Sequence, residues 1–473
     1  MNYKRIDEND ISYLKSILPP GRVLTGDAIN PDYSHDELSG VEHCPDVLVD
    51  VRTTQEVSQI MLYANAHCVP VVARGSGTGL VGACVPVCGG IMVSFEKMNR
   101  ILELDEGNLT LTVEPGVLLM EISAFVESKG LFYPPDPGEK TATIGGNIST
   151  NAGGMRAVKY GVTRDYVRGL EVVLPTGEIV FFGGKTVKNS SGYNLLNLMV
   201  GSEGTLGLIT KAVLKLLPLP KASVSLLIPY DDVISAIRTV PELMKTKVTP
   251  TAVEFMEKGV IMDAEEYLGK KFPDKSADAY LLLTYDGQSR EDIERNFETV
   301  AQVCFPAGGK DLLIIDTDER KDSVWPARSA FLEAIKASTT KIDECDVVVP
   351  KTEVAGFVEY TYSLGEKHAI RIKCFGHAGD GNLHIYTLRD DLSEEDWNNK
   401  VSAVFSDLYA RAAEIGGKVS GEHGIGLDKV KFLEQSEPEA VISLMRGIKS
   451  VFDPNLILNH GKIFTSYGCC VKT

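Results

Sequence analysis

Alternating runs of apolar and polar residues predict a βαβ unit near the start of this chain. Residues 46–51 (Pro-Asp-Val-Leu-Val-Asp) have the length and the apolar content of a strand. Thr53-Thr54-Gln55-Glu56 resembles a capping box, and the residues that follow predict a helix over roughly 54–66. Val69-Pro70-Val71-Val72-Ala73 predicts the next strand, which leads directly into a glycine-rich loop.

The rest of the chain divides into segments of different pattern. Up to about residue 220 it is rich in Gly and Thr, with short apolar runs such as 170–174 and 208–216, which indicates an α+β segment whose loops approach a ligand closely. From about 221 to 410, charged helical stretches such as 290–303 alternate with strand-like runs, and this predicts an antiparallel sheet covered by helices; the runs are 226–228, 280–283 and 312–315. Residues 396–450 are more helical, and Asp453-Pro454-Asn455 predicts the end of a helix.

Composition narrows the class of protein. A chain of 473 residues has room for about three domains, and its 44% of hydrophobic residues can form sizeable cores. Lys plus Arg number 48 and Asp plus Glu 65, and the resulting net charge of −17 argues against a general surface for nucleic acids or anionic membranes. The N-terminus runs into charged residues, and no stretch of about 18 apolar residues occurs, so we expect a soluble cytoplasmic protein without a membrane span.

The nine cysteines predict free thiols rather than a disulfide framework or an iron–sulfur cluster. Their number is odd, and none forms a Cys-x-x-Cys pair. Cys84 and Cys88 lie four residues apart and Cys469 and Cys470 are adjacent, but scattered thiols in a reducing compartment explain both pairs. Any redox reaction therefore needs another carrier.

The first glycine loop matches a dinucleotide fingerprint, but its context argues against a Rossmann fold. Gly77-Thr78-Gly79-Leu80-Val81-Gly82 has the form G-x-G-x-x-G after a predicted strand. A Rossmann site also needs a helix that opens at the third glycine and an acidic residue about 20 positions later. Here the chain continues through Pro86, Gly89 and Gly90 into another strand-like run. Successive N–H groups of a glycine loop can still form a nest for a phosphate, although this loop alone is equally compatible with an ordinary turn.

Two further glycine loops follow and could line an extended ligand together with the first. One runs from Thr141 to Gly154 after Pro134-Pro135-Asp136-Pro137-Gly138, and the other from Gly201 to Thr210. With Arg74-Gly75-Ser76-Gly77-Thr78-Gly79, they resemble the FAD-binding domain of the vanillyl-alcohol oxidase and para-cresol methylhydroxylase family, where a loop Arg-Gly-x-Gly-Thr-Gly cradles the pyrophosphate. The resemblance covers roughly 40–465 and is closest to the FAD-linked D-2-hydroxyacid dehydrogenases, which act on D-lactate, glycolate or D-2-hydroxyglutarate.

This resemblance implies an α+β fold with a two-part FAD-binding domain. The implied segments are an N-terminal extension (1–40), the FAD-binding domain (41–220), a substrate or cap domain with an antiparallel sheet (221–410), and a helical C-terminal segment that completes the active site and the FAD site (411–473). Relatives that attach FAD covalently usually carry a histidine in or beside the first loop. Positions 74–82 contain neither histidine nor cysteine, so we expect non-covalent FAD.

The resemblance also implies which residues contact FAD. These are Arg74, Gly75, Ser76, Gly77, Thr78 and Gly79 near the pyrophosphate, Pro135, Thr141, Gly145, Gly146, Ser149, Gly153 and Gly161 along the flavin and its ribityl chain, and Glu203 and Ile209 near the adenosine half. Asn459, in Ile457-Leu458-Asn459-His460-Gly461-Lys462, corresponds to a family segment that reaches back to the flavin. His460 stands where the family usually has proline.

Two short glycine-flanked segments near the C-terminus contain three of the eight histidines. They are His377-Ala378-Gly379-Asp380-Gly381-Asn382-Leu383-His384 and Ser420-Gly421-Glu422-His423-Gly424. His377, His384 and Glu422 form a mixed nitrogen and oxygen set that suits a divalent Zn, Fe or Mn and leaves coordination positions open for a substrate. His423 is the natural general base, because imidazole exchanges protons near neutral pH. Any one of these histidines alone would more often cap a loop. In the metal-dependent members of the family that this chain resembles, however, both segments have these roles. Asp380 and Asn382 are expected to form the turn.

Substrate choice depends on two further positions. Arg328 matches a carboxylate-binding arginine of the family, and arginine pairs bidentately with carboxylates. In the 2-hydroxyglutarate enzymes a lysine six residues before the proline equivalent to Pro350 binds the second carboxylate, whereas Glu344 stands there in this chain. The sequence therefore predicts oxidation of a D-2-hydroxy monocarboxylic acid, with D-lactate favoured over glycolate or D-2-hydroxyglutarate.

The electron acceptor is the least determined feature. Because the sequence has no iron–sulfur or haem motif and no membrane segment, we expect a separate partner, with an electron-transfer flavoprotein favoured. One alternative is a flavoprotein subunit that relays electrons within a complex and keeps a vestigial hydroxyacid site. Another is the chemistry of the cell-wall precursor reductases or of the ether-lipid synthases on the same fold, which would leave both histidine segments without a role.

Overall fold

The computed structural model describes residues 3–465, with residues 318, 319, 321 and 322 described by their backbone alone, so Cys469 and Cys470 lie outside the described residues. The chain divides into two compact units. Within the described residues, unit 1 comprises 3–152, 162–219 and 422–465, and unit 2 comprises 153–161 and 220–421. One division falls between residues 219 and 220. Residues 153–161 belong to unit 2 rather than with the rest of the predicted FAD-binding segment, and the C-terminal segment returns to unit 1 at residue 422.

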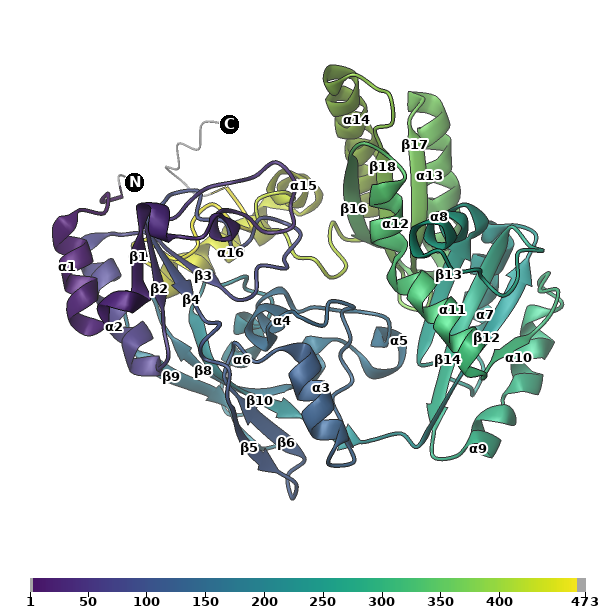
Figure 1. Cartoon of the computed structure of the whole chain (residues 1–473), viewed down its shortest axis with the longest axis horizontal. Helices are drawn as coiled ribbons and strands as arrows, with labels where there is room; N and C mark the ends of the chain where they lie inside the picture. Colours follow the sequence, from purple (N-terminus) through teal and green to yellow (C-terminus); the bar gives the residue numbers. More distant parts are fainter. Residues whose placement is uncertain (1–2, 466–473) are drawn as a thin grey trace. The chain divides into compact units, whose positions relative to one another are not determined.

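The predicted βαβ unit is present in unit 1 (Figure 1). β2 (Val47–Asp50) and β3 (Val71–Arg74) both run parallel to β4 (Ile91–Ser94), which lies between them, and β1 (Val23–Thr25) completes the sheet antiparallel to β2. The helix between them, α2 (Thr54–His67), buries Val57, Ile60, Met61 and Ala64, the spacing of one helical face, in a core shared with α1 (Glu8–Ile17).

The predicted capping box of α2 is only half formed. Thr53 caps the helix, since its hydroxyl accepts the N–H of Glu56 at 3.2 Å. The Glu56 carboxylate does not return to Thr53. It accepts the N–H of Arg52 at 2.7 Å and pairs with the Arg22 guanidinium at 2.5 Å, so a distant ion pair takes the place of the local bond.

A second, antiparallel sheet forms the other half of unit 1. Its strand order is β5 (Ile101–Asp105), β6 (Thr110–Val113), β10 (Leu208–Lys215), β8 (Val167–Val173) and β9 (Ile179–Gly183). The other elements of the unit are the short sheet of β7 (Leu131–Phe132) and β11 (Leu217–Pro218) and the helices α3 (Leu119–Glu127), α4 (Ile144–Thr150), α6 (Leu195–Met199), α15 (Val430–Ser436) and α16 (Glu439–Phe452). Residues 75–90 contain no helix, which confirms that the first glycine loop does not open a Rossmann helix.

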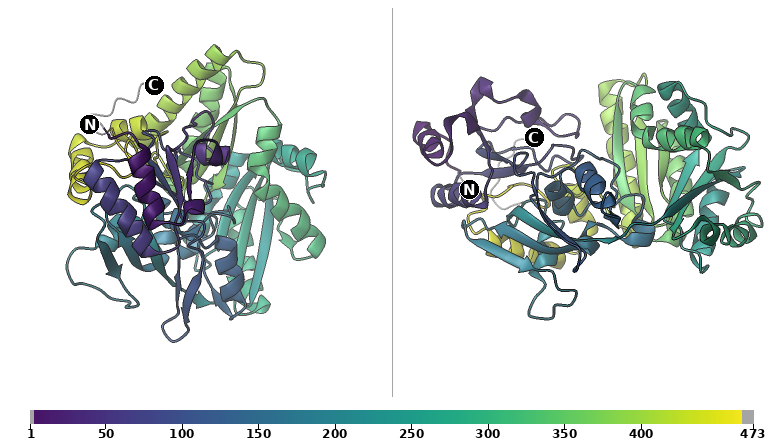
Figure 2. Two further views of the ribbon diagram at one scale, coloured as in Figure 1. Left: turned by 60° about the vertical axis from the view of Figure 1, so that its left-hand side comes forward. Right: turned by 60° about the horizontal axis from the view of Figure 1, so that its bottom comes forward.

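Unit 2 is built on one seven-stranded antiparallel sheet, as the sequence predicts (Figures 1 and 2). The strand order is β15 (Leu313–Ile315), β12 (Ala222–Tyr230), β14 (Ala279–Gly287), β13 (Ala252–Glu257), β17 (Arg371–His377), β18 (Asn382–Leu388) and β16 (Ile342–Val348). Both faces of the central strands are buried, which explains why these segments read as continuous apolar runs rather than as alternating ones.

Helices cover both faces of this sheet. One face packs on α8 (Lys258–Leu268), α11 (Asp318–Ser329) and α12 (Phe331–Ala337), through a core that includes Phe375 and Tyr386. The other helices of the unit are α5 (Ala157–Tyr160), α7 (Val233–Met244), α9 (Arg290–Glu294), α10 (Phe297–Cys304), α13 (Val354–His368) and α14 (Glu394–Glu414). The predicted helical stretch 396–450 is thus interrupted, because a loop separates α14 from α15, and α16 ends at Phe452 before Asp453 as expected.

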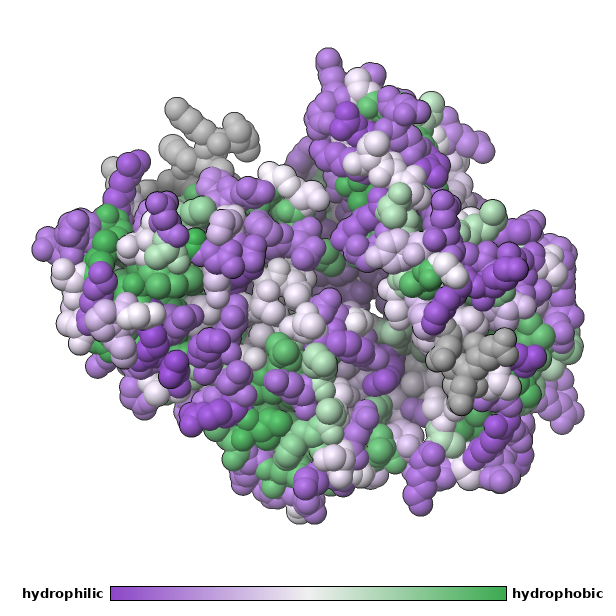
Figure 3. All heavy atoms as spheres, in the orientation of Figure 1, coloured by the Kyte–Doolittle hydropathy of each residue, from purple (hydrophilic) through white to green (hydrophobic). Residues whose placement is uncertain are grey.

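The surface shown in Figure 3 is mainly hydrophilic, in keeping with the net charge of −17. Apolar side chains gather over the hairpin of β5 and β6, where Leu102 is 38% and Leu109 is 36% exposed. Among the described residues, no helix combines the length and the apolar character needed to cross a bilayer.

Candidate active site

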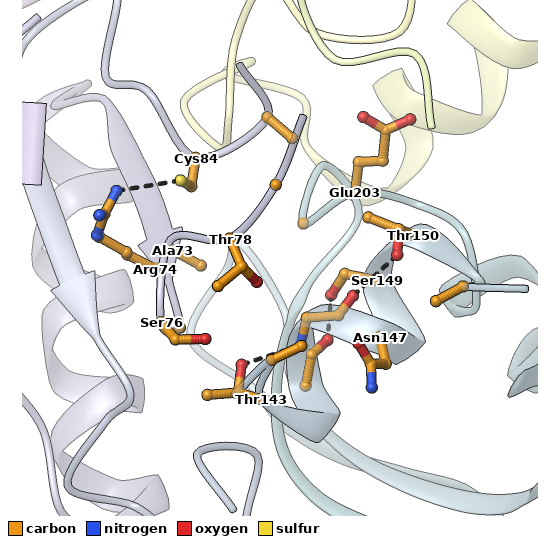
Figure 4. Close-up of a pocket in the computed structure, with 18 of the residues that line it drawn as sticks. Ala73, Arg74, Ser76, Thr78, Cys84, Thr143, Asn147, Ser149, Thr150 and Glu203 are labelled. Carbon is orange, nitrogen blue, oxygen red and sulfur yellow. Dashed lines mark hydrogen bonds between the residues drawn. The ribbon is translucent and has the colours of Figure 1, made fainter. Parts of the chain in front are cut away.

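Unit 1 contains a cavity of about 220 Å³ that the three glycine loops line together (Figure 4). Thr143 caps α4, since its Oγ1 accepts the N–H of Gly146 at 3.4 Å. A Cβ at Gly75 would lie 2.1 Å from Thr143 Oγ1, and one at Gly145 would lie 2.7 Å from the Cβ of Pro115. Glycine is therefore required at both positions, because the first loop lies too close to Thr143 and the start of α4 lies too close to Pro115 for a side chain.

The polar groups of this cavity suit a bound cofactor that both accepts and donates hydrogen bonds. Within the described part of the chain, the N–H groups of Ser76 to Gly79 donate to no other protein group. The hydroxyl of Ser76 and Oδ2 of Asp36 are buried and also have no partner among the described residues. Since buried polar groups are normally hydrogen-bonded, these donors and acceptors indicate a ligand between the loops.

Arg74 links the start of the first loop to the N-terminal segment. Its guanidinium donates to the carbonyls of Asp32 at 2.7 Å and His35 at 2.6 Å, and to Sγ of Cys84 at 3.3 Å, as Figure 4 shows for the last contact. Burial raises the pKa of the Cys84 thiol to about 11, so this sulfur stays protonated. Arg74 lines the cavity, but these bonds direct its charge toward the N-terminal segment.

Glu203 and Asn459 connect the first and third glycine loops to the C-terminal segment through hydrogen bonds. The Glu203 carboxylate accepts the N–H groups of Ile425 at 2.8 Å and Gly426 at 2.7 Å. Nδ2 of Asn459 donates to the carbonyls of Glu203 at 2.7 Å and Ala83 at 2.9 Å. Glu203 and Asn459 both have a positive φ, of 49° and 43°, which for residues other than glycine marks a backbone held by its surroundings.

Most of the residues that the sequence assigns to FAD line this cavity. They are Arg74, Gly75, Ser76, Gly77, Thr78, Gly79, Gly145, Gly146, Ser149, Glu203, Ile209 and Asn459, and Glu422 and His423 line it as well. Pro135, Thr141, Gly153 and Gly161 are not among its lining residues, and the last two belong to unit 2. His460 is buried next to Asn459 and packs edge-on against Tyr3, with ring centroids 5.2 Å apart.

The first histidine segment forms the hairpin between β17 and β18 of unit 2. The N–H groups of Asp380 and Gly381 donate to the carbonyl of His377 at 3.1 and 2.9 Å, and Oδ1 of Asp380 accepts the N–H of Asn382 at 3.1 Å. Nδ2 of Asn382 donates to Oδ1 of Asp346 on β16 at 2.6 Å. Asp380 and Asn382 therefore form and hold the turn, as predicted.

This hairpin brings His377 and His384 side by side. Asn382 and His377 are register partners, and the two-residue alternation of strands places both imidazoles on one face, with ring centroids 5.5 Å apart. Both histidines are only 5% exposed. Nδ1 of His377 lies 2.6 Å from Oε1 of Glu254, and Nδ1 of His384 lies 3.1 Å from Oε1 of Glu344.

Arg328 lies on α11 and bonds the same carboxylate, Glu254, that His377 contacts. Its Nε and Nη2 donate to Oε2 of Glu254 at 2.9 and 2.5 Å, and the guanidinium stacks over Phe375 at 4.7 Å. Burial alone would raise the pKa of Glu254, but His377 and Arg328 beside it hold that pKa below its ordinary value. Glu254 is thus a fully buried carboxylate between the Arg328 guanidinium and the His377 imidazole.

The second histidine segment begins in unit 2 and continues in unit 1. Oδ2 of Asp346 accepts the Ser420 hydroxyl at 2.8 Å and the Gly421 N–H at 3.1 Å, which anchors the start of the segment to β16. Glu422 and His423 follow directly, with Oε1 of Glu422 3.8 Å from Nε2 of His423.

Sequence reasoning did not identify Glu254, Asp346 or Asp36. Glu254 offered one signal, because it is a carboxylate within the apolar strand run Ala252-Val253-Glu254-Phe255-Met256. A charge at the centre of a buried strand needs a partner, so it could have been expected to pair with a cation. Asp36 lies in a polar loop, where the sequence carries no comparable signal.

Comparisons with known protein families agree with this geometry. A model described as "FAD binding domain" matches residues 45–183, and a model described as "FAD linked oxidases, C-terminal domain" matches residues 219–463. The first match contains the first two glycine loops, and the second contains the sheet that carries the histidine hairpin.

Individual relatives cover nearly the whole chain. A D-lactate dehydrogenase of Anaerostipes hadrus is 49% identical over 98% of both chains, and the glycolate oxidase subunit GlcD of Bacillus subtilis is 42% identical over 91% of this chain and 92% of its own. A solved structure of p-cresol methylhydroxylase with substrate bound superimposes with a TM-score of 0.76 over 96% of both chains at 17% identity. The predicted fold of the vanillyl-alcohol oxidase and para-cresol methylhydroxylase type is therefore confirmed.

Proposed function

The chain belongs to the FAD-linked oxidase family, and on that premise we propose that it oxidises a D-2-hydroxy monocarboxylic acid, with D-lactate favoured, to the 2-oxoacid. The observation that carries this proposal is the pair of buried imidazoles of His377 and His384, held side by side on a hairpin. The identity of 49% to a D-lactate dehydrogenase supports the choice of substrate.

Non-covalent FAD fits the cavity of unit 1. The N–H groups of Ser76 to Gly79 suit its pyrophosphate, and the loops leave no side chain at Gly75 or Gly145 to obstruct it. Bound FAD supplies a two-electron acceptor, and a divalent Zn, Fe or Mn supplies a Lewis acid that lowers the pKa of the substrate hydroxyl.

We assign the cation to His377, His384 and Glu422. The two histidines can each offer Nε2, because their Nδ1 atoms lie against carboxylates. Gly421 is bonded to Asp346, the register partner of His384, and the Cα of Glu422 follows that of Gly421 by about 3.8 Å. This tether supports Glu422 as the third ligand.

His423 is assigned as the base that takes the proton of the α-hydroxyl while the hydrogen on Cα leaves as a hydride. It follows Glu422 directly in the sequence, and this adjacency to a proposed ligand supports the assignment. Arg328 is assigned to the substrate carboxylate. Its Nε and Nη2 already bond Glu254, which leaves Nη1 of the planar fork for this contact.

Glu344 supports a monocarboxylate over a dicarboxylate. Its carboxylate lies beside His384 and also accepts the Tyr386 hydroxyl at 2.8 Å. A distal substrate carboxylate near this position would meet a negative charge where the 2-hydroxyglutarate enzymes have a lysine. Glycolate, which has no distal group, is the alternative substrate that this argument leaves open.

Anaerobic flavin spectroscopy tests the proposal. D-lactate is expected to bleach the flavin absorbance of the purified protein, L-lactate is not, and chelation should prevent the bleaching while leaving FAD bound. His423→Ala should abolish bleaching, whereas an electron-relay protein with a vestigial site would be indifferent to that change. Faster turnover of D-2-hydroxyglutarate than of D-lactate at equal concentration would contradict the assignment of substrate.

The electron acceptor is proposed to be a separate electron-transfer flavoprotein. Seven of the nine cysteines lie in the described residues, and none of these seven forms a disulfide there, which supports an acceptor on a separate protein. The test compares the rates at which enzyme with D-lactate reduces an electron-transfer flavoprotein, oxygen and a quinone analogue. No reduction of the flavoprotein would remove this partner.

A further inference from the structure

Four adjacent strands of unit 2 place two carboxylates and two histidines on one face of the sheet. The strand order is β13, β17, β18 and β16, with the histidines on the two inner strands and carboxylates on the two outer ones. Glu254 on β13 is the register partner of His377. Glu344 on β16 is the register partner of Tyr386, two residues from His384 on the same face. Glu254, His377, His384 and Glu344 therefore follow a diagonal across one face of the sheet, with each histidine beside one carboxylate.

We propose that Glu254 and Glu344 are positioning residues that fix the tautomer and orientation of His377 and His384, so that each imidazole presents Nε2 as a ligand. The inference rests on the proposed function for the cation itself, but it concerns only residues of unit 2. It assigns Glu344 a second role beside that in substrate choice.

The geometry fixes the tautomers by elimination. An ionised carboxylate can only accept a hydrogen bond, so the nitrogen facing it must carry the proton. Nδ1 faces Glu254 at 2.6 Å in His377 and Glu344 at 3.1 Å in His384. In a neutral imidazole the proton on Nδ1 leaves the lone pair on Nε2, which is the form that binds a metal ion.

Further contacts hold each carboxylate in place. Glu254 is fully buried and receives two bonds from Arg328 on α11. Glu344 receives the Tyr386 hydroxyl, whose ring stacks on Phe375 at 5.4 Å. Each imidazole is thus fixed through a carboxylate that is itself fixed by another side chain, an arrangement that raises ligand basicity and lowers the entropy lost on binding a cation.

The competing explanation is that these are ordinary buried ion pairs that only stabilise the sheet. The two explanations differ in their consequences. A purely structural pair, once broken, lowers stability but leaves the tautomer and the affinity for a cation unchanged. A positioning residue changes both, even in a protein that remains folded.

The chain offers a matched control on the same strand. Glu257 lies three residues after Glu254 on β13, where its carboxyl group is mostly removed from solvent and bonds to the Tyr362 hydroxyl instead of to a histidine. Glu257→Gln therefore removes a comparable carboxylate from the same strand without touching the histidine pair. Flavin content and circular dichroism report whether each variant folds and keeps FAD.

The first measurement is the histidine tautomer in metal-free protein. With ¹⁵N-labelled histidine, the eight imidazoles give a small set of signals, and His377→Gln and His384→Gln assign the two in question. Near pH 8 we expect both to be neutral with the proton on Nδ1. Glu254→Gln and Glu344→Gln should each shift the tautomer balance of their own histidine, and Glu257→Gln should shift neither. Protons on Nε2 in the wild type would overturn the inference.

The second measurement is the affinity for Zn²⁺, read by competition with a chromophoric chelator. Glu254→Gln and Glu344→Gln should each weaken binding by about 10- to 100-fold, and Glu257→Gln by less than about threefold. If Glu254→Gln does not fold, Glu344→Gln and Glu254→Asp carry the test. Unchanged affinity in folded variants would overturn the inference. A wild type that binds no Zn²⁺, Fe²⁺ or Mn²⁺ yet shows the expected tautomers would refute the cation in the proposed function and leave the positioning role supported.

Discussion

Replacing Glu203 by alanine should release the C-terminal segment that carries Glu422 and His423. The Glu203 carboxylate is 6% exposed and accepts the N–H groups of Ile425 and Gly426 at 2.8 and 2.7 Å. Hydrogen bonds to a charged group contribute about 1.5–3 kcal/mol each, so the loss of both amounts to roughly 3–6 kcal/mol. The effect should stay local, because Leu427 and Ile463 keep their own backbone bonds to Val81 and Gly426.

Hydrogen exchange of the backbone amides measures this release directly. Because about 1.4 kcal/mol corresponds to a tenfold change, a loss of 3–6 kcal/mol should speed exchange at Ile425 and Gly426 by roughly 10²- to 10⁴-fold. Glu203→Gln keeps one acceptor and should give an intermediate effect. Glu106→Ala, on an exposed loop, serves as the control.

The comparison is made in FAD-free protein, so that lost cofactor cannot account for faster exchange. Exchange in Glu203→Ala within about threefold of the wild type would refute the reasoning. FAD affinity is then measured separately, because Glu203 also lines the cavity. Because the family resemblance implies a contact of Glu203 with the adenosine half of FAD, Glu203→Ala should weaken FAD binding more than Glu203→Gln does.

Three other predictions follow from single side chains. Burial raises the pKa of Glu257 to about 7, so the folded protein keeps a proton that the unfolded chain releases near pH 4.5. The free energy of unfolding should therefore fall by up to roughly 3 kcal/mol as pH rises from about 4.5 through 7, and Glu257→Gln should flatten this fall in melting temperatures recorded across that range. Oδ2 of Asp36 is buried in the FAD cavity and has no partner among the described residues. In a flavin fluorescence titration, Asp36→Asn should keep the affinity for FAD and Asp36→Ala should lower it about tenfold. Equal losses of affinity in both variants would contradict this role. Glu344→Lys should raise the ratio of kcat/KM for D-2-hydroxyglutarate to kcat/KM for D-lactate by about 100-fold. The reason is that two like charges about 6 Å apart, at an effective dielectric of about 20, repel by roughly 3 kcal/mol. An unchanged ratio would show that Glu344 does not determine substrate choice.

Local patterns predicted those features that depend on neighbours in the sequence. The helix 54–67, the turn at Asp380 and Asn382 and the end of α16 before Asp453 all follow from residues within a few positions of one another. The separation of seven residues between His377 and His384, with a four-residue turn between strands, is likewise enough to place both on one face.

Features that depend on distant partners could not be predicted in this way. His377 is paired with Glu254, which lies 123 residues earlier, and this contact exists only because β13 lies beside β17 in the sheet. The same holds for Glu56, which an ion pair with Arg22 draws away from the capping box. Strand order and ion pairs between remote segments are properties of the whole fold, and a single sequence gives no direct measure of them.

Glu344 shows why the metal site and the substrate preference are expected to change together. One carboxylate bonds Nδ1 of His384 and places a negative charge where a distal substrate group would lie. Glu344→Lys would supply a cation for a second carboxylate, but it would also remove the acceptor that holds His384 and set a positive charge beside the proposed ligand. The gain in selectivity should therefore come with weaker cation binding and a lower absolute rate for both substrates. A lysine at this position is compatible with an active enzyme only if another acceptor orients the histidine, so a second substitution that provides one should restore the rate without reversing the preference.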